Sequence, residues 1–490
     1  MMTTRLTYAC CLAILSPLLV PADAQVIRVK TIAVAESEQF SFPPSGGMAG
    51  VSIALADTLL DPFVNPAKGG RIRTSQYFGA PSFYSVSSNS GAGTTLPLGV
   101  MWKRGSSFGG LGAAFQQIHR PAPPVNFGFR GVVIDPSSSS FAPPRPTEPT
   151  SHRNRYSFAM LGHTLDSARF SVAASALWSG LDAVDGVEQF YAANDWVRQK
   201  GEAMDLRLGV LKEWVGGASF EAVALRNRFG HAHDVGFTDF FWDPALRSPV
   251  ASPRTEHNAE RTNTWGLHLE YERPLADSGW RVGAMLTGNR ISHPEMPNYE
   301  VTDGLGNAGR SSAFNVGMGV SRSHRKVAFG FDAIYEPISS KTWVADSVDN
   351  RFRFSNAKLR GGVSRTFTMM DPNSALTIQL GAELYSLQYV MNQRDRVNSI
   401  DHVRKEAWLE RTRTAGMSFR VPGVEVHYHV RTRTGVGRPG VVAGNNNNFV
   451  PTFGASDLSF APWMPPVANT SALGPVRVTW HQFAISFPQR

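Results

Sequence analysis

The stretch Trp265-Gly-Leu-His-Leu-Glu-Tyr-Glu272 decides the fold, because its apolar and polar residues alternate without a break. In a β-strand, Trp265, Leu267, Leu269 and Tyr271 share one face, and the residues between them share the other. A tilted strand that crosses a bilayer needs about 9–11 residues, which is close to the length of this segment. The two-residue period therefore predicts a strand with one apolar face, of a length suited to a membrane.

The same alternation recurs along most of the chain, for example over residues 314–321, 327–336, 376–385 and 424–431. The second face of these segments is often Gly, Ser, Asn or Thr, where a soluble sheet would carry more Lys. The apolar face often begins or ends in an aromatic residue, as the interfacial girdles of membrane barrels require. These aromatic residues are Tyr156, Trp178, Trp214, Trp265, Tyr271, Trp280 and Tyr335. A soluble sandwich or propeller is the alternative interpretation.

The connections between these segments differ in length in a regular way. Short turns are predicted at residues 166–168, 216–217, 276–278, 323–324 and 371–373. Long polar loops are predicted at Arg120–Arg153, Arg228–Arg261, Ile291–Arg310 and Gly435–Leu473. Short turns at one end and long loops at the other are typical of outer-membrane barrels. We therefore predict an all-β fold, a transmembrane antiparallel β-barrel of about 14 to 16 strands over residues 71–490.

The N-terminus has the layout of a secretory signal peptide over residues 1–24. Arg5 supplies a positive charge, Ala9–Val20 is apolar, and Ala22-Asp23-Ala24 offers a cleavage site before Gln25. Both cysteines of the chain lie in this leader. The mature chain is therefore expected to be exported and to contain no disulfide or thiolate site.

The charge pattern argues against a nucleic-acid partner. The net charge is +9, but the basic residues are scattered among carboxylates and do not form one patch. We interpret the excess as charge in the barrel interior and in the loops. Mean hydropathy is −0.19, an average that a membrane barrel shares with soluble proteins because its two faces alternate.

The last predicted strand, Val476–Phe487, ends in alternating apolar residues, with Phe483, Ile485 and Phe487 on one face. It resembles the C-terminal aromatic signal that the outer-membrane insertion machinery reads, although Pro488-Gln-Arg490 follows the last Phe. The resemblance implies that this machinery is a partner during biogenesis. The cell outer membrane is the expected location, with its lipid around the barrel.

One segment before the first strand does not alternate. It reads Gly47-Met-Ala-Gly-Val-Ser-Ile-Ala-Leu-Ala-Asp57 and leads through Asp61-Pro62 to Asn65-Pro-Ala67. Because it precedes the barrel, it can fold back into the lumen, so residues 25–70 are predicted to form an N-terminal periplasmic or plug segment. The G-x-A-G stretch, the Ala-Asp step and the N-P-A element resemble the plug of the FadL/PorV superfamily of outer-membrane barrels. Thr58 and Lys68 depart from that pattern.

This resemblance implies passive uptake of small hydrophobic compounds through a plugged barrel. The alternative is a PorV-like partner or shuttle in protein secretion, without a transport path. The implied plug or gating residues are Gly47, Gly50, Ser52, Asp57, Asp61, Asn65, Pro66 and Ala67. An alternative for the N-P-A element is that it only caps and turns the chain. Aromatics suited to capture stand in the predicted loops at Phe127, Phe129, Phe237, Phe240, Phe241 and Trp242.

Several charged residues are predicted to line the lumen: His268, Glu270, Glu272, Glu425, His427, His429 and Arg431. They could form charge ladders on a solute path or simply satisfy one another inside the barrel. His231, His233 and Asp234 have metal-like spacing, but no further ligand is evident, so no metal site or cofactor is expected. No catalytic arrangement can be placed by sequence, and an enzyme is not expected.

Overall fold

The structure is a computed structural model. It describes residues 45–55, 62–87, 92–120, 150–182, 196–243, 245–246, 248–275, 279–294, 308–344, 348–369, 371, 373–396, 399–442 and 473–488. The predicted signal peptide, Asp57, Asp61, Phe127 and Phe129 lie outside the described residues. No helix in these ranges is long and apolar enough to cross a membrane.

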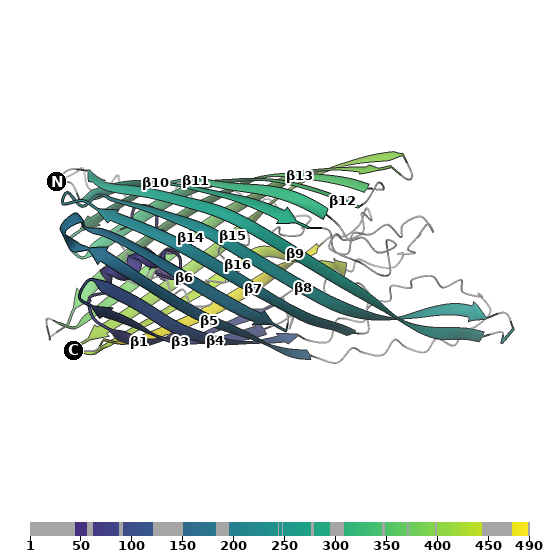
Figure 1. Cartoon of the computed structure of the whole chain (residues 1–490), viewed down its shortest axis with the longest axis horizontal. Helices are drawn as coiled ribbons and strands as arrows, with labels where there is room; N and C mark the ends of the chain where they lie inside the picture. The colour runs from purple at the N-terminus through teal and green to yellow at the C-terminus, as the bar shows by residue number, and fades with distance from the viewer. Residues whose placement is uncertain are drawn as a thin grey trace, which may run out of the picture.

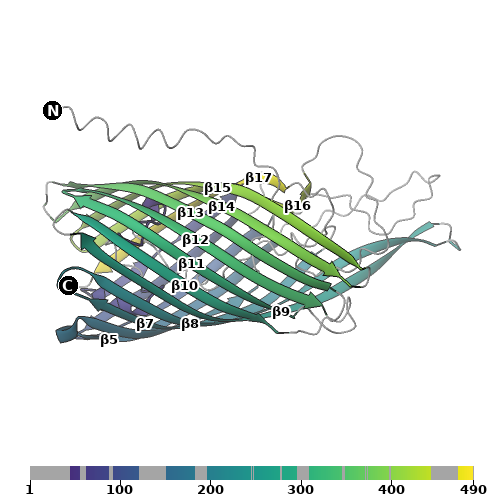
Figure 2. The same ribbon diagram turned by 90° about the horizontal axis from the view of Figure 1, so that it is seen from above.

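The described chain forms one antiparallel sheet that closes on itself (Figures 1 and 2). Each strand pairs with its neighbours in sequence, and the last strand returns to the first. The strand segments are β1 (Gln76–Gly79), β2 (Ser82–Val86), β3 (Ala92–Arg104), β4 (Ser107–Arg120), β5 (Thr150–Leu165), β6 (Phe170–Leu181), β7 (Trp196–Glu213), β8 (Ser219–Asp243), β9 (Ser248–Leu275), β10 (Trp280–His293), β11 (Ala308–His324), β12 (Val327–Val344), β13 (Val348–Thr368), β14 (Ala375–Asp395), β15 (Ile400–Val421), β16 (Val424–Val442) and β17 (Leu473–Pro488). The described residues also form three short 3-10 helices, η3 (Gly46–Met48), η4 (Pro66–Arg71) and η5 (Asp166–Ala168).

β1 and β2 are two parts of one strand. Both pair with β17 on one side and with β3 on the other, and the register continues unchanged across Ala80 and Pro81. Pro81 has no N–H to donate, which interrupts the ladder at this point. The seventeen segments of the described chain therefore make a barrel of sixteen strands, in agreement with the predicted range.

The predicted faces are confirmed where the alternation is clearest. Leu267, Phe329 and Leu380 are outward and 50%, 36% and 57% exposed, while the residues beside them point into the barrel. An outward apolar surface of this kind is what the hydrocarbon of a bilayer requires. Tyr156 corrects one expectation, because it is only 5% exposed and faces inward, where its hydroxyl donates to Gln116 Oε1 at 2.9 Å. A tyrosine that faces the lumen with a polar partner is not a girdle residue.

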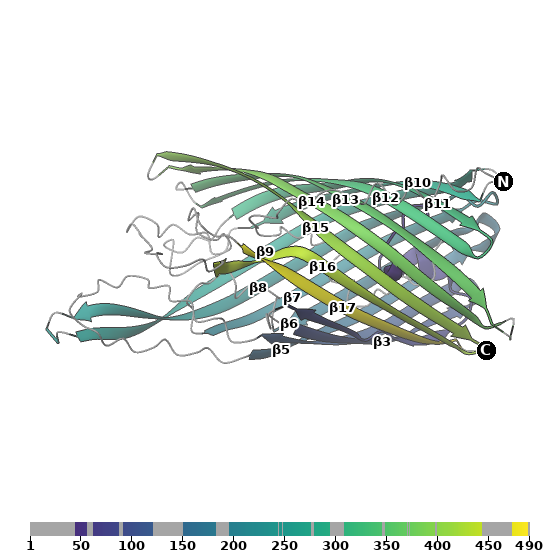
Figure 3. The same ribbon diagram turned by 180° about the vertical axis from the view of Figure 1, so that it is seen from behind.

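The two ends of the barrel differ, as predicted. One end, the turn end, carries short connections and the end of β17; the other, the loop end, carries the long connections together with some short ones, such as that between β12 and β13 (Figures 1 and 3). The prediction of a long loop at Arg228–Arg261 is wrong. β8 and β9 instead remain paired along this whole stretch and project as a hairpin beyond the barrel. Mutual pairing satisfies the backbone groups of both strands, so the ladder continues beyond the barrel.

Candidate functional site

Two short segments lie inside the barrel near the turn end, visible as purple ribbon in Figures 1 and 3. We call Ser45–Leu55 the first luminal segment and Pro62–Arg71 the second luminal segment. Met48, Val51 and Ile53 of the first segment are almost fully buried, as are Phe63 and Ala67 of the second. Both segments are too short to bury these side chains by themselves, so the barrel wall supplies their surroundings.

The wall holds the first luminal segment chiefly through its backbone N–H groups. The N–H of Ala49 donates to Thr414 Oγ1 at 2.9 Å and the N–H of Ser52 donates to Asp332 Oδ2 at 2.8 Å. The N–H of Gly47 donates to Gln379 Oε1 at 3.2 Å. Apart from η3, the segment has no regular structure, and inward side chains thus replace the partners that a helix or sheet would provide.

The carbonyl groups of the same segment also find partners on the wall. Ser321 Oγ donates to Ala54 O at 2.7 Å, and Thr414 Oγ1 donates to Gly47 O at 2.8 Å. Arg360 Nη1 donates to Gly50 O at 3.3 Å. These donors stand on β11, β13 and β15, so the segment is bonded across several strands.

The first luminal segment and the barrel wall approach each other so closely that glycine is required on both sides. A Cβ on Gly47 would lie 2.6 Å from Gly416 Cα, and a Cβ on Gly362 would lie 2.5 Å from Met48 Cβ. Gly50 has a φ of +73°, a conformation that favours glycine. Further inward glycines that meet this segment are Gly283, Gly317, Gly319, Gly330 and Gly381. The small inward face predicted from the alternation is therefore the surface against which the first luminal segment packs.

The N-P-A element begins the second luminal segment and does two things at once. Asn65 Oδ1 accepts the N–H of Ala67 at 3.0 Å and Pro66 occupies the first turn, so Asn65 caps η4. Asn65 Nδ2 also donates to Glu221 Oε2 at 2.7 Å on β8. The element therefore caps the chain and also joins it to the wall.

Buried charges fix the second luminal segment. Arg207 on β7 forms two hydrogen bonds to Asp205, at 2.8 and 2.9 Å, and donates to the carbonyls of Phe63 and Val64. Lys68 Nζ lies 2.9 Å from Glu221 Oε1, so the departure from an apolar residue at Lys68 has a partner on the wall. Both pairs are buried, and a buried pair is costly to break from one side.

Aromatic packing completes this contact. The ring centroid of Phe63 lies 4.8 Å from that of Phe158 and 5.6 Å from that of Phe78. Phe108 and Met160 belong to the same buried cluster, which extends over β3 to β8. On this side the lumen near the turn end is filled with side chains.

The predicted lumen-lining residues all face inward but form two separate groups. On β9, His268 Nδ1 lies 2.7 Å from Thr287 Oγ1, Glu270 Oε2 lies 3.6 Å from His268 Nε2, and Glu272 pairs with Arg281 at 2.9 Å. On β9 each of these predicted residues therefore has a polar or charged side-chain partner within the wall. The group does not meet the β16 residues, which stand seven strands away.

On β16, His429 is the predicted residue closest to the first luminal segment, since a Cβ on Gly46 would meet its ring at 2.5 Å. Glu425 pairs with His427 at 3.3 Å and with Arg420 at 2.7 Å. The Arg431 guanidinium lies over the Trp480 ring, 5.4 Å from its centroid. The residues that hold the luminal segments were not singled out from the sequence; the most direct are Ser321, Asp332, Arg360, Gln379, Thr414, Arg207 and Glu221.

Farther from the turn end, the inner wall changes from charged to apolar. Glu383 on β14 pairs with Arg360 at 2.8 Å and with Arg433 at 3.6 Å. Beyond it along β14 the inward residues are Leu387, Tyr389 and Met391. They form a buried cluster with inward residues of the neighbouring strands, Ala313, Ile338, Phe352 and Phe354. We call this cluster the inner apolar wall.

No protein-family model and no curated protein sequence matches the chain. Among solved structures it is similar to a Pseudomonas aeruginosa FadL homologue, at 10% identity over 91% of this chain and 98% of that one, with a TM-score of 0.47. It is also similar to the CymD monoaromatic hydrocarbon channel, at 11% identity over 72% and 96% of the two chains, with a TM-score of 0.37. The Pseudomonas putida toluene transporter TodX matches at 10% identity over 92% and 99%, with a TM-score of 0.33. A FadL homologue, as the motif resemblance implied, is thus among the structures that this chain resembles.

Proposed function

We propose that this protein is an outer-membrane barrel for the passive uptake of small hydrophobic compounds. The inner apolar wall is the observation that carries the proposal. Phe354 and Tyr389 lie with their ring centroids 5.6 Å apart on the inward side of the wall, and both are buried in the cluster. A wall of this kind lowers the free energy of an apolar solute inside the lumen, where a charged wall would favour ions and water.

The luminal segments supply the second requirement, a barrier to unselective flow. A sixteen-stranded barrel has a lumen wide enough for an aqueous channel unless something occupies it. Here the two segments bond to strands on both sides of the barrel, from β7 and β8 to β15. A small apolar compound would bind on the inner apolar wall and pass the segments when they shift.

The proposal is tested by uptake into liposomes that contain the purified barrel. We expect faster entry of a monoaromatic hydrocarbon and of a long-chain fatty acid, and unchanged entry of a sugar. Leu387→Glu should reduce this uptake, because it places a charge on the inner apolar wall. Gln388→Glu is the matched control, since the adjacent side chain faces outward and is exposed.

Two results would count against the proposal. If sugars and apolar compounds entered equally fast, the barrel would be a general porin. If none of them entered faster than into empty liposomes, while the barrel was correctly folded, the secretion-partner alternative would be favoured, because that role needs no transport path.

A further inference from the structure

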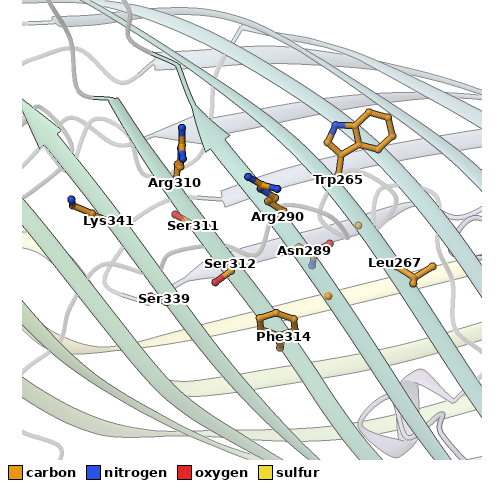
Figure 4. Close-up of a pocket in the computed structure, with 12 residues that line it drawn as sticks. Trp265, Leu267, Asn289, Arg290, Arg310, Ser311, Ser312, Phe314, Ser339 and Lys341 are labelled. Atoms are coloured by element: carbon orange, nitrogen blue, oxygen red, sulfur yellow. The ribbon is translucent and has the colours of Figure 1, made fainter.

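The outer wall of the barrel carries a groove across β9 to β12, toward the loop end (Figure 4). Its volume is about 630 Å³. Trp265, Leu267 and Phe314 provide its apolar part, and Arg290, Arg310 and Lys341 provide its charged part. In Figure 4, Arg290 lies between Arg310 and Trp265, and Lys341 stands on the next strand beyond Arg310. The groove thus combines three cations and three large apolar side chains on a surface that faces away from the lumen.

The groove lies where the apolar belt of the wall ends. On β12 the outward residues are apolar or aromatic from Val327 to Pro337 and become polar at Ser339 and Lys341. Ten residues at a rise of ~3.3 Å and a tilt of ~40° span roughly 25 Å, the height of the lipid-facing band of a membrane barrel. The cations therefore stand at the level of the lipid headgroups.

The positive charges of the three cations add up, because no neighbouring carboxylate among the described residues neutralises them. Arg310 stands directly opposite Lys341 on the paired strand, and Lys341 stands opposite Arg351 on its other side. Within the described part of the chain, no carboxylate forms an ion pair with Arg290, Arg310 or Lys341. Like charges placed directly opposite each other destabilise a sheet. An anion bound between them would remove that cost.

The surroundings specify what kind of anion fits. Ser312 and Ser339 line the groove with hydroxyl donors. The Arg226 guanidinium lies 4.7 Å from the Trp265 ring centroid, which extends the basic surface onto β8. Leu267 and Phe314 lie one step nearer the centre of the apolar belt. A ligand with phosphate groups at one end and hydrocarbon chains at the other would satisfy both halves of the groove.

We propose that this groove binds a phosphate-bearing glycolipid of the outer leaflet, with its phosphates on Arg290, Arg310 and Lys341 and its acyl chains along Leu267 and Phe314. The inference rests on the outer-membrane placement proposed above and is independent of transport. The loop end is the external end of an outer-membrane barrel, which puts the groove in the outer leaflet. A lipid held there would neutralise adjacent cations on β10, β11 and β12.

The test is a titration of the purified full-length barrel in neutral detergent with fluorescent lipid A. The double variant Arg290→Gln, Arg310→Gln should bind about thirtyfold more weakly, because each basic residue near an anionic lipid contributes about a factor of five. The matched control is Arg322→Gln, Arg365→Gln. It removes the same charge from exposed outward residues at the turn end, where Arg322 lies over Trp280 and Arg365 over Phe367. The control should bind like the unaltered barrel.

Lipid A without its phosphates should bind the double variant and the unaltered barrel equally weakly. Equal affinity of both double variants for intact lipid A would overturn the proposal, because binding would then follow net charge and not the groove. Full displacement of lipid A by inorganic phosphate would also overturn it, since the site would then bind a free anion. Uptake is measured in a separate assay, so a negative result for lipid A binding does not affect the transport proposal.

Discussion

The two luminal segments occupy one lumen but are held in different ways. The first luminal segment meets glycines, and its backbone is bonded to side chains such as Thr414 and Asp332. The second luminal segment meets aromatic rings, accepts hydrogen bonds from Arg207 at two carbonyls, and pairs with the wall through Lys68 and Glu221. Both contacts include hydrogen bonds to charged side chains, but the ion pair of Lys68 with Glu221, between a segment and the wall, belongs to the second.

The difference suggests which of the two segments can move. A typical intramolecular hydrogen bond contributes about 0.5–1.5 kcal/mol net, and several can be exchanged one at a time for water. Release of the second luminal segment would also break the Lys68–Glu221 pair, and the loss of one partner from a buried pair costs about 3–5 kcal/mol. We therefore expect the second luminal segment to act as the anchor and the first to act as the movable part.

Deletion of each segment is the largest test of this comparison. Removal of Gly47–Asp61 should leave barrel folding largely intact and raise the permeability to small solutes. Removal of Phe63–Arg71 should lower the stability of the barrel, because it strips partners from Arg207 and Glu221. Conductance in planar bilayers and heat-modifiable migration on gels measure the two effects. If the first deletion lowered heat stability and left conductance unchanged, that segment would be a structural cork.

Single arginine substitutions compare the two contacts at one position each. Arg207→Ala should destabilise the barrel by about 3–5 kcal/mol, because Asp205 stays buried without its partner. Arg360→Ala should cost about 1 kcal/mol, because it is more exposed and Glu383 still has Arg433 within 3.6 Å. Urea unfolding in micelles measures both free energies. Similar losses for the two variants would remove the distinction between anchor and movable part.

A methyl group added to one of the inward glycines tests how tightly the first luminal segment packs against the wall. Gly362→Ala should cost about 1–3 kcal/mol or displace the first luminal segment, because its Cβ would lie 2.5 Å from Met48 Cβ. Gly361→Ala is the control on the same strand, since its nearest neighbour would lie 3.7 Å away. Protease cleavage near Met48 reports a displaced segment, and unfolding midpoints report the free energy. Equal behaviour of the two variants would contradict a tight fit.

A smaller effect than that of the glycine substitution is expected for the cap at Asn65. Asn65→Ala should cost roughly 0.5–2 kcal/mol, because it removes the cap of η4. Asn65→Asp keeps a capping oxygen but places a carboxylate where an amide now donates to Glu221 at 2.7 Å. The aspartate variant should therefore be the less stable of the two in thermal unfolding. A more stable aspartate variant would show that the cap outweighs the contact with the wall.

The barrel and its faces could be predicted because the alternation is local. Each inward or outward assignment depends only on the residues two positions away, as for Leu267 and Leu380. The prediction was wrong for 228–261, where the paired strands run beyond the barrel and carry no apolar row to mark them. Tyr156 faces inward although its residue type is typical of a girdle, because its position in the alternation decides its face.

The partners of the luminal segments could not be predicted in the same way. The motif located Gly47, Gly50 and Asn65 before the first strand, but Ser52 bonds to Asp332, 280 residues later. Which inward residue of β12 meets which residue of the segment depends on the stagger of many strands around the barrel. The stagger of the strands cannot be read from any local sequence pattern.

The interrupted strand formed by β1 and β2 has a consequence for how the barrel is assembled. It pairs with β17, so the seam of the cylinder joins Gln76 to Pro488 across nearly the whole described chain. Contacts so distant in sequence carry the greatest loss of chain entropy and make folding slow. The two luminal segments are synthesised before any strand, and the cylinder is sealed only by the last one. Closure is therefore the step that decides whether the lumen is sealed with its occupant inside. Pro81, which has no N–H to donate, stands on that seam.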